Sequence, residues 1–581
     1  MNNSSSSSTS DSCQPDGNYR HWFLIPAVAI LTILAFLNRR KSFKTEMFKG
    51  RPGVVIPIDF LDRNRNTIVT LFGAITGSIL LLVRNNFTSH DNPWAKAFLT
   101  ILICIEIAFL FHPIFGCLAS HYRILGSLLG FSYSLSFFLV ENIQNFESYE
   151  KCKGYTLPRI LEGIPLFLCQ LFIIGKFLIV LFKERKNFGQ LFYDETKDNS
   201  INVKLSLPWF NDYVKNIFYP RQTPDHSKVL SYLRKIYNPH KYFKFSTHTL
   251  SVLMVCCIIL YGATIPFIII VAQSFNVSDQ NSTSEDVIRG IRVLLDCLIA
   301  ALILTFLFCA LSLLRFMENH KNNMLRMFKG DKSFIPKRIE SSQFMIGKSL
   351  RYQSFQIGYF LWGYLLQWLM LFLICGFFYS LKFPIVRKWV LNRVKVASVF
   401  FAVGLLTYLT LPLTAVTIFR DPDYNKNVIS MNNRNAYLVF SYFWFFIGLP
   451  MGILSALSRI LKAMIIGLIL LPRVDHSVLP EGFQRLDPGY ISYIAYLHVQ
   501  AAFRNPILRG FCQTIFDRKN GIRQWKCSPQ ARTRWFLALT LTRNPEIISY
   551  RKDKEKVLND PVRTSSLKIN LPSSDETNLV V

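Results

Sequence analysis

Few residues in this sequence could do chemistry, and the strongest candidates lie inside long apolar segments. Glu106 is near the middle of one such segment, and His112 follows it, directly before Pro113. An ionisable side chain inside a membrane is costly and is therefore a candidate for function. For Glu106, a protonated or hydrogen-bonded packing role is favoured over a substrate or proton role. For His112, a satisfied imidazole beside a proline kink is favoured over a ligand or a base.

Motifs for catalysis, nucleotide binding and metal binding are incomplete or missing in the sequence. Gly347-Lys348-Ser349 resembles the end of a Walker A loop, but Ser342 stands where the upstream glycine is required. The 12 cysteines form no CxxC pair, so the sequence predicts neither a zinc site nor a disulfide-dense scaffold. We therefore predict no enzyme, no metal and no cofactor.

The net charge of +30 would suggest nucleic acid in a soluble protein. Here the lysines and arginines cluster beside apolar segments, where they would meet the anionic lipid of the cytoplasmic membrane surface. The sequence therefore indicates membrane lipid as the partner of these charges and no nucleic acid.

Half of the residues are hydrophobic (51%), and they occur in long runs that predict an all-α polytopic membrane protein. The ten apolar segments are Trp22–Leu37, Thr67–Val83, Lys96–Leu118, Tyr122–Val140, Arg159–Phe182, Thr247–Ala272, Ile291–Leu314, Phe355–Leu381, Val396–Phe419 and Tyr437–Leu471. The last segment has Gly448, Pro450 and Gly452 at its middle, which favours a re-entrant pair of half-helices over one straight span. We expect about nine transmembrane helices plus one re-entrant intramembrane element, with cytoplasmic amphipathic helices.

Charge and glycosylation patterns predict which segments face outwards. The basic cluster that begins at Arg39 follows the first apolar segment, so we place the N-terminus outside and that cluster inside. Alternation along the ten segments then gives each connection a side and leaves the C-terminus in the cytoplasm. Glycosylation sequons occur only at Asn2, Asn3, Asn86, Asn276 and Asn281, and all five fall in segments placed outside.

The same alternation predicts the organisation of the chain. The expected parts are an extracellular glycosylated arm (1–21), spans one to five (22–182), a cytoplasmic basic connection (183–246), spans six to nine (247–419) with an extracellular loop (273–290), the re-entrant element (420–471) and a cytoplasmic tail with basic amphipathic helices (472–581). Cys13 and Cys152 are then the cysteines expected outside the bilayer on the outer face, and a disulfide between them is a hypothesis.

Three stretches outside the apolar segments resemble a known family. They are Gly50-Arg51-Pro52-Gly53 leading to Pro57-Ile58-Asp59-Phe60-Leu61, Leu479-Pro480 leading to Leu486-Asp487-Pro488-Gly489-Tyr490, and Arg534-Trp535 leading to Asn544-Pro545 and Arg551-Lys552. Together they resemble the receptor family for plasma retinol-binding protein, and more closely its shorter receptor-like branch. The resemblance implies a plasma-membrane homodimer that takes retinol from this carrier and passes it, without fuel, through an apolar cleft into the cell.

The resemblance also implies that the carrier binds the connection between the sixth and seventh spans. The candidate contacts in this chain are Phe275, Val277, Val287 and Ile288. This sequence departs from the family pattern, because the connection is short and polar and lacks the tyrosine- and glycine-containing stretch expected there. The alternatives are that the carrier uses other outer surfaces or that the ligand arrives differently.

A basic segment near the C-terminus has an aromatic anchor and aliphatic residues within helical reach. Its residues are Arg532, Arg534, Trp535, Phe536, Leu539, Leu541 and Arg543. This pattern fits a calmodulin target and an amphipathic helix on a membrane surface equally well. The family resemblance favours calmodulin.

Two other function classes compete with the receptor. A secondary transporter or channel for another small solute would need polar residues at the membrane midplane and repeat symmetry, and Glu106 alone is thin support. A membrane enzyme acting on lipid would need His112 as its catalytic residue.

Overall fold

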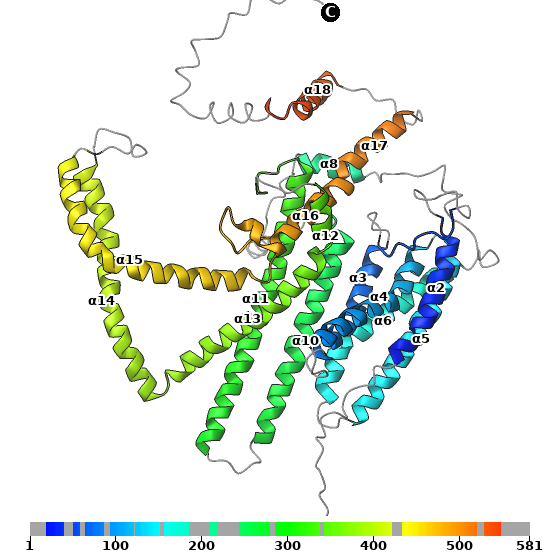
Figure 1. The fold of residues 1–581 in the computed structure, drawn as a ribbon, viewed down its shortest axis with the longest axis horizontal. Coiled ribbons are helices and arrows are strands. Elements are labelled where there is room, and N and C mark those ends of the chain that lie inside the picture. Colours follow the sequence, from blue (N-terminus) through cyan, green and yellow to red (C-terminus); the bar gives the residue numbers. More distant parts are fainter. Residues whose placement is uncertain are drawn as a thin grey trace, which may run out of the picture. The chain divides into compact units, whose positions relative to one another are not determined.

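The computed structural model describes most of the chain, and its regular structure is helical (Figure 1). The described residues are 19–39, 50–58, 64–85, 93–120, 122–151, 156–184, 209–218, 237, 243–278, 285–336, 342–420, 431, 433–519 and 528–547. Within them the only strand-like pairing is an isolated bridge between Arg420 and Met431. The chain divides into two compact units at Leu508, and each is described by itself.

Six helices of the first unit form an N-terminal bundle. They are α1 (Tyr19–Trp22), α2 (Leu24–Leu37), α3 (Arg65–Asn85), α4 (Pro93–Ala119), α5 (Arg123–Lys151) and α6 (Thr156–Lys183). Helix α2 packs on α4, α4 on α5, α5 on α6 and α6 on α3. Their shared core is aliphatic and aromatic, with Leu34, Leu71, Leu110 and Phe177 almost fully buried.

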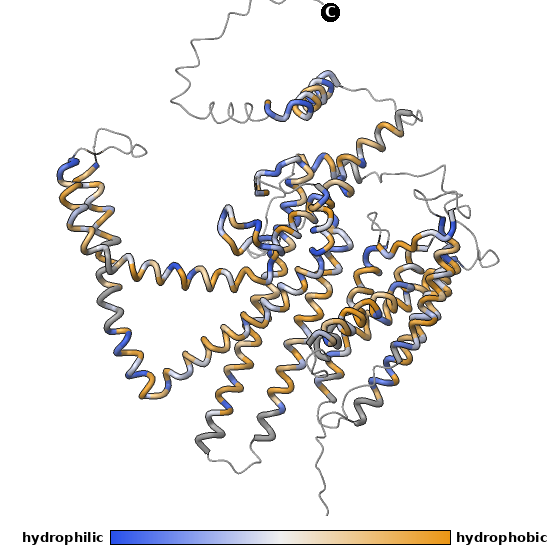
Figure 2. Tube along the Cα trace, in the orientation of Figure 1, coloured by the Kyte–Doolittle hydropathy of each residue, from blue (hydrophilic) through white to orange (hydrophobic). Residues whose placement is uncertain are grey.

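Three long helices form the next bundle, which packs on α3 and α6 through its first helix. They are α10 (Thr247–Ser278), α11 (Glu285–Phe328) and α13 (Tyr352–Ser380). Figure 2 shows that these helices are hydrophobic over most of their length. Pro165 in α6 cannot donate to the Leu161 carbonyl, and the Tyr261 hydroxyl of α10 donates to it at 3.0 Å. A side chain of one helix thus satisfies a carbonyl that proline leaves free in its neighbour.

A cluster of buried residues, here called the aromatic cluster, surrounds the C-terminal end of α11. Its shorter helices are α8 (Trp209–Phe218), α12 (Ser342–Ser349) and α16 (Pro488–Phe503), with the 3₁₀ turn η5 (Gln484–Leu486) before α16. The cluster consists of Tyr213, Ile217, Phe316, Met324, Met327, Phe328, Ile335, Met345, Tyr352, Val474, Tyr490, Tyr493, Ile494, Ala495, Tyr496 and Leu497. Helix α11 has 44 residues, more than twice the ~20 that cross a bilayer, so its last part extends past the membrane.

The helices after α13 are mostly exposed, and they are apolar apart from the basic first part of α14. They are α14 (Pro384–Thr414), the π-helical turn η4 (Ala415–Phe419) and α15 (Arg434–Leu470), here together called the arm. In the segment Met451–Leu470 of α15 no residue is buried. Exposed apolar surface is stable in lipid, because acyl chains are as apolar as leucine.

Two further helices contribute to the second unit. They are α17 (Pro506–Lys519), most of which follows Leu508, and α18 (Pro529–Arg543). The Ser528 hydroxyl accepts a hydrogen bond from the Ala531 N–H at 3.2 Å and thereby caps the start of α18.

The predicted apolar segments lie in helices, and fewer of the described helices than predicted are long and apolar enough to be membrane spans. Each of the ten segments lies within helical structure apart from Phe23 and at most one residue at an end, although several of the helices extend well beyond the segment. Seven described helices are long and apolar enough to cross a membrane, and the apolar helices Leu24–Leu37 and Gly404–Phe419 are shorter. The helical membrane class is therefore supported, and the nine spans and the re-entrant element stay predictions.

Two predicted details differ from the structure. The expected loop 273–290 is helical at both ends, because α10 continues to Ser278 and α11 begins at Glu285. The expected pair of half-helices is one continuous helix, α15, which bends along its length (Figure 1). Proline and glycine at its middle kink a helix without ending it when the rest of the segment stays helical.

Candidate functional site

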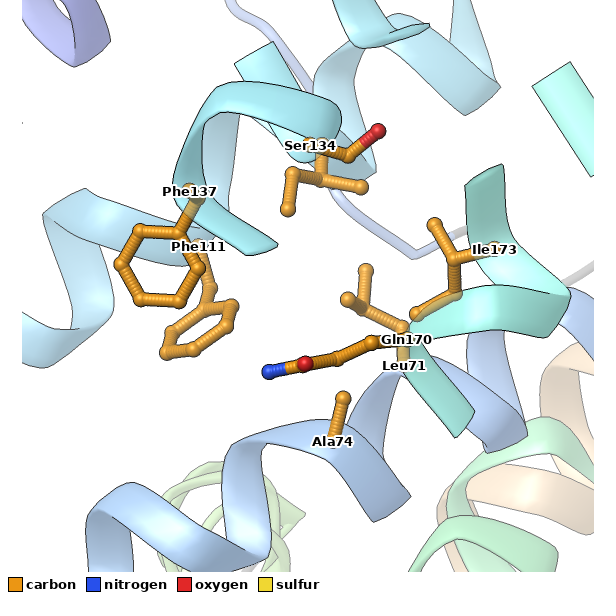
Figure 3. A pocket seen from close by; sticks show the side chains of 8 residues that line it. Leu71, Ala74, Phe111, Ser134, Phe137, Gln170 and Ile173 are labelled. Carbon is orange, nitrogen blue, oxygen red and sulfur yellow. The ribbon is translucent and has the colours of Figure 1, made fainter. Parts of the chain in front are cut away.

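A small cavity lies inside the N-terminal bundle, between α3, α4, α5 and α6 (Figure 3). Its lining is apolar apart from Ser134 and Gln170, and the Gln170 side chain reaches towards Phe111. The cavity volume is about 20 Å³, which is room for a single water molecule. Ligand pockets measure some 300 Å³ or more, so this cavity does not hold a retinoid.

The arm carries a run of aromatic side chains, and most of those in α15 are exposed. In α15 the rings of Phe440 and Trp444 stack, with their centroids 5.9 Å apart and an angle of 8° between their planes. The ring of Phe419 in η4 contacts the rings of Tyr437 and Phe440, with centroid distances of 5.6 and 5.7 Å. Phe440 and Trp444 are half-buried, while the exposed rings of this helix are Tyr437, Tyr442, Phe443, Phe445 and Phe446. We call the α15 rings from Tyr437 to Phe446 the aromatic surface, and flat apolar molecules can lie on such a surface.

The two candidate residues of α4 both have partners. Glu106 Oε1 lies 2.6 Å from Nδ1 of His21, which belongs to α1. His112 Nε2 lies 3.2 Å from the Val55 carbonyl oxygen, so this imidazole bonds to the segment that follows α2. The bond to Val55 agrees with the satisfied imidazole that the sequence favours for His112. The contact of Glu106 is with an exposed histidine, and its packing role stays a prediction. The sequence pattern alone does not reveal His21 as the partner of Glu106.

A buried ion pair lies where the chain leaves α15 and enters the aromatic cluster. Arg473 donates from Nε and a terminal nitrogen to the Asp475 carboxylate, at 3.1 and 2.6 Å. The Asn319 amide of α11 donates to the same carboxylate at 3.0 Å. The Asp475 side chain is fully buried. Through the bond from Asn319, this buried carboxylate connects the segment after α15 to α11. Sequence analysis missed these residues, whose only signal is an Arg-x-Asp spacing outside the apolar segments.

The predicted carrier-binding residues lie on two helix ends rather than in a loop. Phe275 and Val277 belong to the last turns of α10, and Val287 and Ile288 to the first turn of α11. The connection between these helices, residues 279–284, lies outside the described residues. The four positions are therefore brought to neighbouring ends of consecutive helices, and a role in carrier binding stays a prediction.

All seven predicted calmodulin-binding residues lie on α18. Trp535 and Phe536 are about half exposed, and Trp535 stacks on Phe511 of α17 with ring centroids 5.2 Å apart. Arg532 lies over the ring of Phe536 at 5.8 Å. A basic helix with exposed aromatic side chains is thus available to a partner.

Most predicted modification sites lie outside the described residues. These are Asn2, Asn3, Asn86, Asn281, Cys13 and Cys152. Asn276 is in the last turn of α10.

Comparison with known proteins gives a match along nearly the whole chain. The family model described as "Retinol binding protein receptor" matches residues 11–553. The mouse protein "Stimulated by retinoic acid gene 6 protein-like" is 28% identical over 597 residues, covering 92% of this chain and 93% of its own length. The bovine protein "Receptor for retinol uptake STRA6" is 23% identical over 632 residues, covering 93% of this chain and 92% of its own length. The human protein of the same name is also 23% identical and covers 93% of this chain and 91% of its own.

Proposed function

The chain belongs to the retinol binding protein receptor family, and from this premise we propose that it is a cell-surface receptor that takes up retinol from plasma retinol-binding protein. The family match over residues 11–553 is the observation that carries the proposal, since it includes the membrane helices and most of the tail. The long apolar helices support it, because a receptor for retinol uptake has to work within a membrane.

The transfer that we propose is passive. Moving a retinoid from water to an apolar environment is favourable by roughly 25 cal/mol per Å² of apolar surface, so no fuel is needed once the carrier releases it. The receptor has to weaken the hold of the carrier and shield the path to the membrane. The cavity of the N-terminal bundle is too small for this path, so we assign the path to the exposed apolar helices, with the aromatic surface of α15 as its candidate wall.

Further features belong to the proposal. The chain would form a homodimer, carry glycans at its outer sequons, have its N-terminus outside and its C-terminus in the cytoplasm, and bind calmodulin through α18. The outer face would also hold the Cys13–Cys152 disulfide, and peptide mapping without reductant that found either thiol free would remove it. A role as a transporter of another solute or as a channel gains no support from the comparisons, in which the relatives named as retinol receptors span nearly the whole chain.

The direct test is uptake of labelled retinol, presented on its plasma carrier, by cells with and without this protein. Surface binding of labelled carrier is measured in parallel. We expect uptake above that of untransfected cells, together with saturable carrier binding. Uptake without carrier binding would mean that the ligand arrives by another route, and the absence of both would overturn the proposed function.

A further inference from the structure

Two carbonyl groups in the last turn of α15, those of Leu468 and Ile469, receive hydrogen bonds from α13. Pro472 has no N–H, so it cannot donate to the Leu468 carbonyl four residues earlier. The Arg473 N–H donates to the Leu470 carbonyl at 3.0 Å and is thus not placed for Ile469. The Gln367 amide of α13 donates from Nε2 to the Leu468 oxygen at 3.0 Å and to the Ile469 oxygen at 3.3 Å. One glutamine therefore acts as the C-terminal cap of a different helix.

Two more residues of α13 hold the same end of α15. Gln356 precedes Gln367 by three helical turns, so both lie on one face, and its Nε2 donates to the Pro472 carbonyl at 2.9 Å. Between them, Gly363 touches Pro472 directly, and a Cβ added at Gly363 would come within 2.5 Å of Pro472 Cγ. Both glutamine side chains are almost fully buried. We call Gln356, Gly363 and Gln367, together with Leu468, Ile469 and Pro472, the joint.

The neighbouring bundle fixes the orientation of the Gln367 amide. Its Oε1 lies 3.4 Å from Sγ of Cys309 on α11, and a thiol can donate weakly to a carbonyl oxygen. With Oε1 occupied in this way, Nε2 is directed at the α15 carbonyls. The joint therefore connects α15 to α11 as well as to α13.

The joint lies between two parts of very different burial. Before it, no residue of Met451–Leu470 is buried. After it, Val474 is almost fully buried in the aromatic cluster, and Arg473 pairs with the buried Asp475. The exposed arm is thus tied to a rigid part of the protein at a short segment of chain.

We propose that Gln356, Gly363 and Gln367 are positioning residues. They hold the C-terminal end of α15 and thereby fix the position of the arm relative to α11 and α13. The arm carries the aromatic surface, so its position would control retinol transfer, and this part of the inference rests on the proposed function. Loss of one such buried hydrogen bond changes the ratio between two states by about fivefold. We expect a similar change in the ratio of native to displaced arm positions.

The test uses the full-length protein with encoded spin labels at Leu304 of α11 and Ile460 of α15, both exposed positions. Gly363→Ala and Gln367→Leu should each broaden or shift the distance distribution between the labels. Gly358→Ala is the matched control, because it adds the same methyl group on the same helix where nothing lies within 4 Å. This control should keep the wild-type distribution.

A second variant separates positioning from general damage. Pro472→Ala restores an N–H that can donate to the Leu468 carbonyl, so Gln367 is no longer its only available donor. Gln367→Leu should therefore shift the distances much less in the Pro472→Ala background than in the wild type. Equal effects in both backgrounds, an unchanged distribution in Gly363→Ala, or an equal change in Gly358→Ala would each overturn the inference.

Retinol uptake per surface receptor is measured on the same variants. We expect Gln367→Leu and Gly363→Ala to lower uptake by up to about fivefold at equal surface abundance, with Gly358→Ala at the wild-type rate. If the arm shifts and uptake stays at the wild-type rate, the link between joint and transfer is wrong. A wild-type protein without uptake would instead refute the proposed function, and the distance measurements would still decide whether the joint positions the arm.

Discussion

Several polar residues inside this protein pair with backbone carbonyls that prolines leave free. Tyr261 donates to the carbonyl that Pro165 leaves free in α6, and Gln367 does the same at the end of α15. An unpaired carbonyl in lipid or in a dry core costs up to several kcal/mol, so each of these side chains has a clear structural task. Polar residues in apolar segments of this chain are thus explained by backbone pairing before any transport role is invoked.

The buried charge of Asp475 gives a prediction at the scale of the residue. Asp475→Asn leaves the buried Arg473 guanidinium without its counter-ion, which costs about 3 to 5 kcal/mol of unfolding free energy. Thermal unfolding of the purified protein in detergent should therefore show a clearly lower midpoint.

The matched control for Asp475 is Asp331, which also pairs with an arginine but in solvent. Hydrogen bonds from Ser333, then the bond and charge of Arg326, lower the pKa of Asp331 to about 2, so it is ionised at neutral pH. Arg326 and Asp331 are each about 40% exposed, and exposed pairs contribute at most about 1 kcal/mol. Asp331→Asn should melt near the wild type, and equal losses in the two variants would refute the argument from burial.

The helices differ in what covers them, and this difference decides what each can do. Helices α3 and α10 are packed on several sides, whereas α15 and α18 are exposed for most of their length. Exposure has different meanings for these two helices. Helix α15 is apolar and suits lipid, a retinoid or a second protomer, while α18 is basic and suits calmodulin or an anionic membrane surface.

The calmodulin proposal predicts that the face of α18 that carries Trp535 contributes most of the calmodulin binding. Trp535→Ala removes the aromatic anchor and should weaken calcium-dependent calmodulin binding of the full-length protein about tenfold or more. Leu537 is exposed on the same helix, about 200° around its axis from Trp535, so Leu537→Ala serves as the control. Equal loss in both variants would contradict a defined calmodulin face. Binding to anionic vesicles without calmodulin binding would favour the membrane-surface role.

At the scale of the whole molecule, the family match assigns the chain to a receptor family. Glycosylation can test on which side of the membrane its connections lie. If the N-terminus is outside, the sequon at Asn281 is glycosylated and Asn281→Gln increases gel mobility. Lys204→Thr creates an Asn202-Val203-Thr acceptor in the predicted cytoplasmic connection, and this variant should gain no glycan. Digestion with a glycosidase should bring all variants to one mobility. A glycan on the new acceptor would reverse the predicted orientation of that connection.

The homodimer can be tested on single receptors. We expect two bleaching steps from fluorescently tagged protein in lipid nanodiscs, compared with tagged membrane proteins of known stoichiometry. Exposed apolar helices alone do not require a partner, since lipid covers them equally well. One bleaching step would therefore refute the dimer without contradicting the structure.

The sequence by itself determined the helical membrane class and the positions of the apolar helices. Spans of this kind depend on local hydrophobicity, and each backbone group pairs within its own helix, so the pattern is readable residue by residue. The stretches near Gly50, Asp487 and Trp535 also pointed to the receptor family, which the comparisons confirm. The satisfied imidazole expected for His112 agrees with the structure, although its partner could not be named from the pattern.

Only the tertiary structure decided which distant residues meet. Gln367 and Leu468 are about a hundred residues apart, and nothing in either segment specifies the other until α13 packs against the end of α15. The same holds for His21 with Glu106 and for Asn319 with Asp475. The continuous α15 and the lengthened α10 and α11 likewise differ from the sequence prediction. The physical reason is that breaks and helix ends depend on whether neighbouring side chains satisfy freed backbone groups, which local composition does not encode.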